Sequence, residues 1–167
     1  MTNPNMNVTR EFALAGKAIF TISAPSGKRY TFKVERKGVK YATQLPTLNG
    51  YMYFLSTKVG ADNDSNSSYV YTGIVAPVEG GLIHTAKSAY PRTSEPYAVA
   101  VFALRIIWGA REIPEGYAIQ HAGRCGRCAK TLTTPESIEA GFGDECVRRM
   151  KADKTFPAPD RLRMVAS

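Results

Sequence analysis

The sequence predicts an α+β fold in which an antiparallel β-meander is covered by one apolar helix and followed by a small cysteine-containing module. Through the first half of the chain, short segments rich in β-branched and aromatic residues alternate with turn sequences. A single apolar stretch of helical length follows at 95–108. All three cysteines then fall in the C-terminal third, between Cys125 and Cys146.

The meander is predicted from segments with period-two alternation. Segments 18–23 and 28–35 flank the turn sequence Ala-Pro-Ser-Gly at 24–27, which predicts a β-hairpin. Three further strands are expected at 51–58, 69–75 and 82–85.

Alternation within the hairpin also predicts which face is buried, because successive strand side chains point to opposite faces. One face should be apolar and pack together: Phe20, Ile22, Tyr30, Phe32 and Val34. The opposite face should meet water through Thr31, Lys33 and Glu35.

Tyrosines recur at a period of two on the third and fourth expected strands, at Tyr51, Tyr53, Tyr69 and Tyr71. If these strands pair, one sheet face could carry several phenol rings. Such a face either stacks nucleic-acid bases or packs under a helix with its hydroxyls at the rim. The sequence alone leaves both open.

The apolar stretch at 95–108 predicts the main helix. Ser94 is the expected N-cap, Pro96 is tolerated in the first turn, and Gly109 should end the helix. Apart from Arg105 it is apolar nearly all round. It is shorter than the roughly 20 residues that cross a bilayer, so we expect a core helix laid across the sheet.

The cysteines occur in the pattern His-x3-Cys-x2-Cys-x17-Cys, at His121, Cys125, Cys128 and Cys146. The first two cysteines should share one tight turn. The third should lie in the first turn of a helix, where the helix dipole favours the metal-binding thiolate. With an imidazole as fourth ligand, the set is typical of a closed, tetrahedral structural zinc site.

Other interpretations of the cysteines remain. Three thiols cannot all pair in disulfides, and a Cys125–Cys128 redox pair would need a helix directly after it, where 129–132 looks like a hairpin arm. Unrelated buried thiols are the remaining alternative. His84 could replace His121 as the fourth ligand, and Asp144 is a poorer substitute.

This stretch also resembles a known family. The segments Gly-Arg-Cys-Gly-Arg-Cys at 123–128, 132–141, and Gly-Asp-Glu-Cys at 143–146 resemble an uncharacterised zinc-knuckle family of phage, prophage and actinobacterial proteins. Asp144 stands where that family usually has proline. The resemblance covers about residues 121–150, and it implies a mobile-element protein with a zinc-organised C-terminus, but no reaction.

The expected domain organisation is an α+β domain at 1–116, a zinc-knuckle module at 117–155 and a flexible basic tail at 156–167. Residues 1–9 should be frayed, and 117–120 should form a strand that delivers His121. Within the module, 135–140 should be a helix with Thr134 as cap and Gly141 as stop, and a second helix should begin at 144. This order of elements is treble-clef-like.

Composition limits the class of protein. No apolar run is long enough to span a membrane, and the N-terminus lacks the features of a signal peptide. Free cysteines without an export signal indicate a reducing cytoplasm, that of a bacterial host if the resemblance holds.

The net charge of +8 favours polyanions or acidic protein surfaces as partners. The segment from Arg10 to Lys40 contains eight basic and two acidic residues. This excess indicates either a polyanion-binding surface or a solvated strand surface whose lysines prevent pairing at the sheet edge. The candidate nucleic-acid contacts are Lys28, Arg29, Lys33, Arg36 and Lys37 in the hairpin, with Arg124 and Arg127 in the knuckle.

The motifs of common enzymes are missing: the chain has no Gly-x-Ser-x-Gly, phosphate loop or dinucleotide fingerprint. A zinc deaminase would need His-x-Glu and Pro before the Cys-x2-Cys pair, whereas Arg124 precedes Cys125. Four protein ligands would also leave zinc no open position for water. We therefore expect no enzyme and no small-molecule substrate.

Two functions remain. The first is a zinc-binding accessory protein of a phage or mobile element that binds nucleic acid through its basic β-hairpin. The alternative is an anti-defence protein that inhibits a host defence complex by binding it. Nucleic-acid affinity should fall steeply with added salt, and this distinguishes the two.

Overall fold

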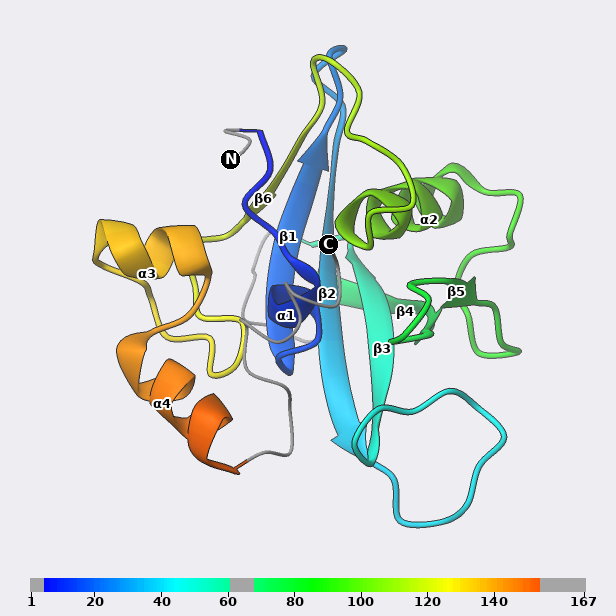
Figure 1. Ribbon diagram of the computed structural model, residues 1–167. Helices are drawn as coiled ribbons and strands as arrows, with labels where there is room; N and C mark the ends of the chain where they lie inside the picture. Colours follow the sequence, from blue (N-terminus) through cyan, green and yellow to red (C-terminus); the bar gives the residue numbers. More distant parts are fainter. Residues whose placement is uncertain (1–4, 61–67, 154–167) are drawn as a thin grey trace.

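The computed structural model describes residues 5–60 and 68–153 of the chain. Its fold is α+β, with a six-stranded antiparallel sheet in the order β5-β4-β3-β2-β1-β6 (Figure 1). The strands are β1 (Lys17–Ser23), β2 (Arg29–Gly38), β3 (Tyr51–Lys58), β4 (Tyr69–Val75), β5 (Leu82–Ile83) and β6 (Ala118–His121). The helices are α1 (Arg10–Ala13), α2 (Glu95–Ile107), α3 (Pro135–Ala140) and α4 (Asp144–Asp153).

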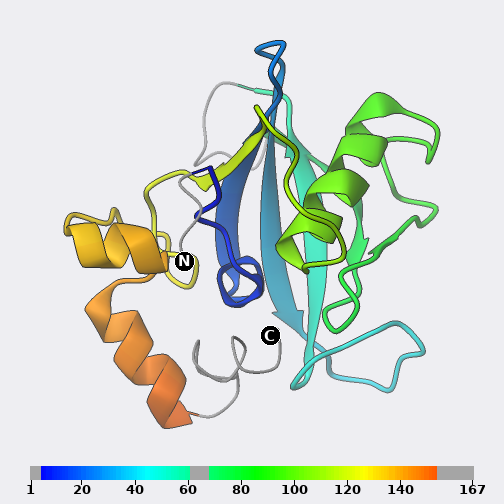
Figure 2. The same cartoon turned by 45° about the horizontal axis from the view of Figure 1, so that its top comes forward.

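Five strands form the predicted meander, and β6 returns from the far end of the chain to pair with β1. The expected tail at 156–167 lies outside the described residues. Figure 2 shows α2 lying across one side of the sheet, while α3 and α4 lie beyond its β1–β6 edge. No helix of 5–60 or 68–153 is long and apolar enough to cross a membrane.

One face of the sheet, which we call the covered face, packs against α1 and α2. Phe20 lies opposite Phe32 in the β1–β2 register, and Val34 lies opposite Leu55 in β2–β3. All four side chains are fully buried in the core cluster that also contains Leu104 of α2. The predicted apolar face of the hairpin is confirmed.

The main helix lies where it was expected, but Ser94 does not cap it with its side chain. The Ser94 hydroxyl instead donates to the carbonyl oxygen of Pro91 at 2.7 Å. Ser94 still occupies the N-cap position with extended backbone, and Gly109 follows the helix with φ of +79°.

The other face of the sheet, the second face, carries the odd-numbered residues of β2. Lys33 belongs to it but is only 9% exposed, so the expectation that it meets water is wrong. Its Nζ lies 3.4 Å from Glu35 Oε1 and 4.4 Å from the ring centre of Tyr69. The long lysine stem packs along the sheet while the ammonium keeps polar contacts.

A β-bulge separates the four tyrosines that a strict period of two would place together. Leu55 pairs with Gly73, but the next residue, Ser56, pairs with Tyr71, so Thr72 is the extra residue of β4. A bulge reverses the side-chain alternation on the strand that contains it. Tyr53 is buried on the covered face, and the bulge consequently places Tyr69 and Tyr71 on the second face, so a shared tyrosine platform is ruled out.

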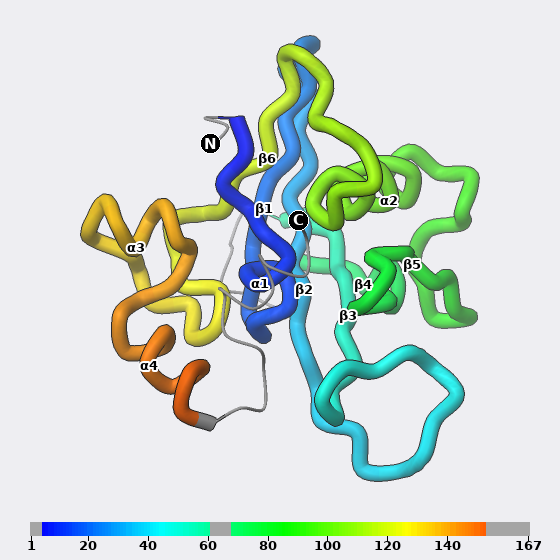
Figure 3. Tube along the Cα trace, in the orientation of Figure 1, coloured from blue at the N-terminus to red at the C-terminus, as the bar shows by residue number. Residues whose placement is uncertain are grey.

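The C-terminal module is joined to the sheet through β6. The expected strand at 117–120 is confirmed, and its neighbour on the other side is the N-terminal segment (Figure 3). Asn7 N–H donates to the Ile119 carbonyl at 3.1 Å, and Ile119 N–H donates to the Asn5 carbonyl at 2.8 Å. Residues 5–8 are therefore not frayed, and Val8 is 2% exposed.

Candidate metal centre

The three cysteines meet beside the sheet edge. Cys125 and Cys128 lie on the turn that follows β6, and Cys146 lies in the first turn of α4. Their sulfur atoms all lie within 4.8 Å of one another, and none forms a disulfide. Cys125 and Cys146 are buried, whereas Cys128 is exposed. The predicted grouping of the sulfurs is confirmed.

Local sequence explains how the sulfurs are brought together. Cys125 N–H donates to the Lys130 carbonyl and Ala129 N–H donates to the Cys125 carbonyl, both at 2.8 Å, which closes a tight turn between the first two cysteines. The next segment is α3, which begins with a capping box between Thr134 and Ser137. Gly141 ends α3 in the left-handed region, and the chain then turns into α4 with Cys146.

Phe12 of α1 holds this module against the sheet, a role that sequence reasoning missed. Its ring is 1% exposed and lies 5.2 Å from the His121 ring and 6.0 Å from the Phe142 ring, centroid to centroid. A Cβ added to Gly126 would lie 2.7 Å from Phe12 Cδ2, and one added to Gly141 would lie 2.6 Å from it. The two glycines therefore make room for the Phe12 ring against the cysteine turn.

This close approach gives a first prediction. Gly126→Ala should lower the free energy of unfolding by about 1–3 kcal/mol, because the new methyl group overpacks against Phe12. Denaturant unfolding followed by circular dichroism measures the change. Gly143→Ala is the matched control, since a Cβ there meets nothing within 4 Å. The double variant Phe12→Leu/Gly126→Ala should recover part of the loss, and equal losses in Gly126→Ala and the control would contradict the explanation.

His121 does not join the sulfurs. Its Nδ1 accepts the Gly123 N–H at 2.9 Å, which leaves the proton on Nε2, and Nε2 donates to the Ile138 carbonyl at 2.6 Å. The alternative histidine, His84, lies beside β5, with Nε2 3.1 Å from the Tyr90 carbonyl. Within 5–60 and 68–153, the grouped ligand atoms are the three sulfurs.

Residues 118–151 match DUF6011, a family of unknown function. The match covers β6, all three cysteines and α3, the same part of the chain that carries the resemblance in sequence. It assigns no activity. No curated protein and no solved structure is significantly similar to the chain.

The pKa values of two thiols in the DUF6011 segment, Cys128 and Cys146, are shifted in opposite directions. Burial, together with hydrogen bonds to Cys128 and Cys125, raises the pKa of Cys146 to about 12. Burial also disfavours the Cys128 thiolate, but the Lys130 backbone N–H and the neighbouring thiols outweigh it and lower the pKa of Cys128. Three thiolates this close repel one another, and a divalent cation relieves the repulsion by binding them. The donor set therefore fits a metal ion that prefers sulfur ligands.

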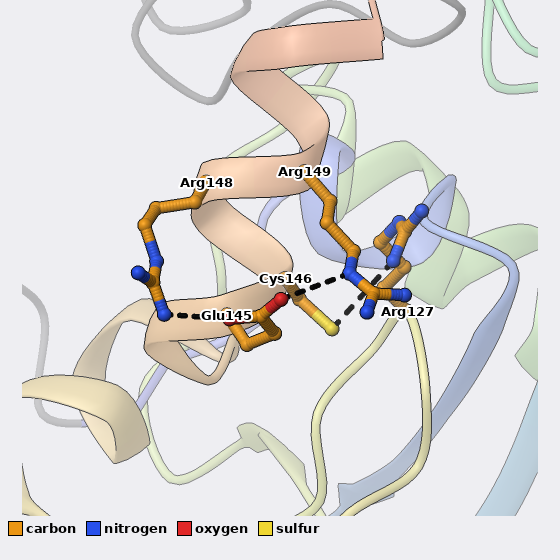
Figure 4. Close-up of polar contacts among 5 residues, drawn as sticks. All are labelled: Arg127, Glu145, Cys146, Arg148 and Arg149. Carbon is orange, nitrogen blue, oxygen red and sulfur yellow. Dashed lines mark hydrogen bonds and ion pairs between the residues drawn. The ribbon is translucent and has the colours of Figure 1, made fainter.

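Cationic side chains surround the sulfurs. Arg127 Nη1 lies 3.8 Å from Cys146 Sγ (Figure 4). A pocket of about 240 Å³ opens here, and its lining residues are Arg127, Cys128, Lys130, Glu145, Cys146 and Arg149. Glu145 accepts hydrogen bonds from Arg148 at 2.5 Å and from Arg149 at 3.1 Å. Arg127, predicted as a nucleic-acid contact, thus lies beside the cysteine cluster that could hold a metal ion.

The structure does not gather the seven basic residues predicted to bind nucleic acid into one patch. Lys28 pairs with Glu95 at 2.5 Å, and the Arg36 guanidinium lies 4.3 Å from the Tyr51 ring centre on the covered face. Arg124 forms a backbone bridge with Thr131 in the DUF6011 segment. The second face of the sheet carries Arg29, Lys33 and Lys37.

Proposed function

We propose that Cys125, Cys128 and Cys146 hold a structural zinc ion and that the protein binds nucleic acid rather than catalysing a reaction. We further propose that it is an accessory protein of a phage or mobile element, as the resemblance of the DUF6011 segment implies. The observation that carries the binding proposal is the combination of charge and aromatic rings on the second face of the sheet.

The strands place an excess of positive charge on this face. Registers between neighbouring strands put five basic residues and one acidic residue on it: Lys17, Arg29, Lys33, Lys37, Lys58 and Glu35. Lys17, Arg29 and Lys37 are exposed. A basic sheet face of this kind attracts the phosphate backbone of a nucleic acid.

Aromatic rings accompany the charges. The Phe54 and Tyr71 ring centroids are 6.2 Å apart, and Lys37 Nζ lies 5.6 Å from the Phe54 ring centre. Both rings are half-buried, so part of each remains accessible. Bases of single strands stack on such rings while cations contact the phosphates. The arrangement supports binding of single-stranded nucleic acid, with Tyr71 and Phe54 as the stacking rings.

The proposal is tested by fluorescence anisotropy with labelled single-stranded RNA, single-stranded DNA and duplex DNA over a range of salt concentrations. Single strands should bind more tightly than duplex. Phe54→Ala should cost roughly 1–3 kcal/mol of binding free energy because a stacking ring is lost. Lys37→Ala should reduce the slope of log affinity against log salt by about 0.7, the share of one phosphate contact.

The matched control is Arg105→Ala, which removes the same charge from an exposed position on α2, away from the second face. Its affinity should equal that of the parent protein. Equal losses in Arg105→Ala and Lys37→Ala would contradict the assignment of the face. No binding at low salt would remove nucleic-acid binding altogether and leave inhibition of a host defence complex as the proposal to test.

A further inference from the structure

His121 has a structural role that competes with metal binding. Its two ring nitrogens bond the backbone on either side of the cysteine turn, at Gly123 and Ile138, and its ring packs on Phe12. His121 is 9% exposed. Turning the ring towards the sulfurs would disrupt these hydrogen bonds, and buried polar groups that lose their partners disfavour that rotation.

The carboxylate of Glu145, the acidic residue nearest in sequence to Cys146, already accepts hydrogen bonds from arginines. Glu145 precedes Cys146 and accepts from Arg148 and Arg149. No oxygen of Glu145 or Asp144 joins the cluster of ligand atoms among residues 5–60 and 68–153. The described part of the chain therefore offers three ligands to an ion that favours four.

The side of the centre that carries Cys128 and Cys146 faces the pocket, because both residues line it. Three cationic residues line it with them: Arg127, Lys130 and Arg149. Figure 4 shows Arg127 and Arg149 on the side to which the Cys146 sulfur points, whereas Arg148 extends away from it. Glu145 is the single carboxylate of the described lining, and three thiolates with a divalent ion add one more negative charge, so the three cationic residues leave the pocket net positive.

We infer that the metal centre keeps its fourth coordination position for a small anion from outside the chain, bound in this pocket. A site closed by four protein ligands admits no such ligand, whereas a site with three keeps one position open. The surrounding cations favour an anionic ligand over a neutral one. This inference rests on the proposed metal site but not on nucleic-acid binding. It replaces the closed site expected from sequence, so the expectation that four protein ligands leave zinc no open position no longer applies.

The test uses the full chain loaded with Co²⁺, whose visible absorption reports the ligands of the ion, and azide as the probe. Azide should shift the absorption bands along a saturable binding curve. Arg149→Ala should weaken azide binding about fivefold, as expected for losing one nearby charge in water. Arg148→Ala is the control, because it removes the same charge and also a partner of Glu145, but does not line the pocket.

A second measurement needs no substitution. In the zinc-loaded protein, long-range ¹H–¹⁵N spectra should show His121 protonated on Nε2 with Nδ1 free of metal. Stoichiometric cobalt binding without any azide response would overturn the inference, as would a metal-bound His121 nitrogen; either result means that the chain closes the site itself. Failure to bind cobalt would refute the metal centre as well.

Discussion

Replacement of Cys125 with serine should abolish tight metal binding and lower the stability of the protein by several kcal/mol. Cys125 is fully buried among the three sulfurs, and a serine hydroxyl there does not ionise to replace the thiolate. Structural zinc contributes roughly 10–16 kcal/mol in isolated zinc-finger peptides. We expect a smaller loss here because β6 also holds the DUF6011 segment through its pairing with β1. Elemental analysis and thermal unfolding measure the two effects.

Chelation provides the control for this substitution. A strong chelator should lower the melting temperature of the parent protein to about that of Cys125→Ser, and should leave the variant unchanged, because stabilisation by a ligand follows from its binding to the folded state. The proposed metal site would be contradicted if the parent protein purified without metal, or if its melting temperature were the same with and without the chelator.

Phe12→Ala should lower the free energy of unfolding by about 3–5 kcal/mol, the usual cost of deleting a buried phenyl ring. The ring fills the space between the cysteine turn, Gly141 and His121. Its loss should also weaken metal binding, because the turn that carries Cys125 and Cys128 would lose its support. Denaturant unfolding and competition with a metal indicator measure the two effects.

Tyr41→Ala is a suitable control for Phe12→Ala, since Tyr41 is 84% exposed. Its unfolding free energy should stay within about 0.5 kcal/mol of the parent value. A loss below about 1 kcal/mol for Phe12→Ala would show that α1 does not support the metal centre.

Much of the fold follows from local sequence patterns. The strands β1 to β4 lie within a few residues of their expected positions because period-two alternation reports the buried face of a strand directly. The cluster of Cys125, Cys128 and Cys146 was also predictable, since their spacing puts two thiols on one turn and one at a helix start. Each of these features depends on residues close together in sequence.

The errors came from features that depend on distant partners. The bulge at Thr72 arises from the register between β3 and β4, and it reverses the side-chain alternation that would put all four tyrosines on one face. Lys33 was expected in water because its strand position is polar, but Glu35 and the Tyr69 ring enclose it. No pattern within a single strand reports such neighbours.

Spacing along the chain was enough to predict the α+β class, the apolar helix and the three sulfurs of the candidate centre. The support of that centre and the partners of its neighbouring side chains depend instead on contacts between segments far apart in the chain. Phe12 lies more than a hundred residues before the cysteines, and it reaches them because the N-terminal segment pairs with β6. The same packing places backbone groups of Gly123 and Ile138 within hydrogen-bond distance of the His121 ring. A buried imidazole needs such partners for both nitrogens, and here the backbone provides them.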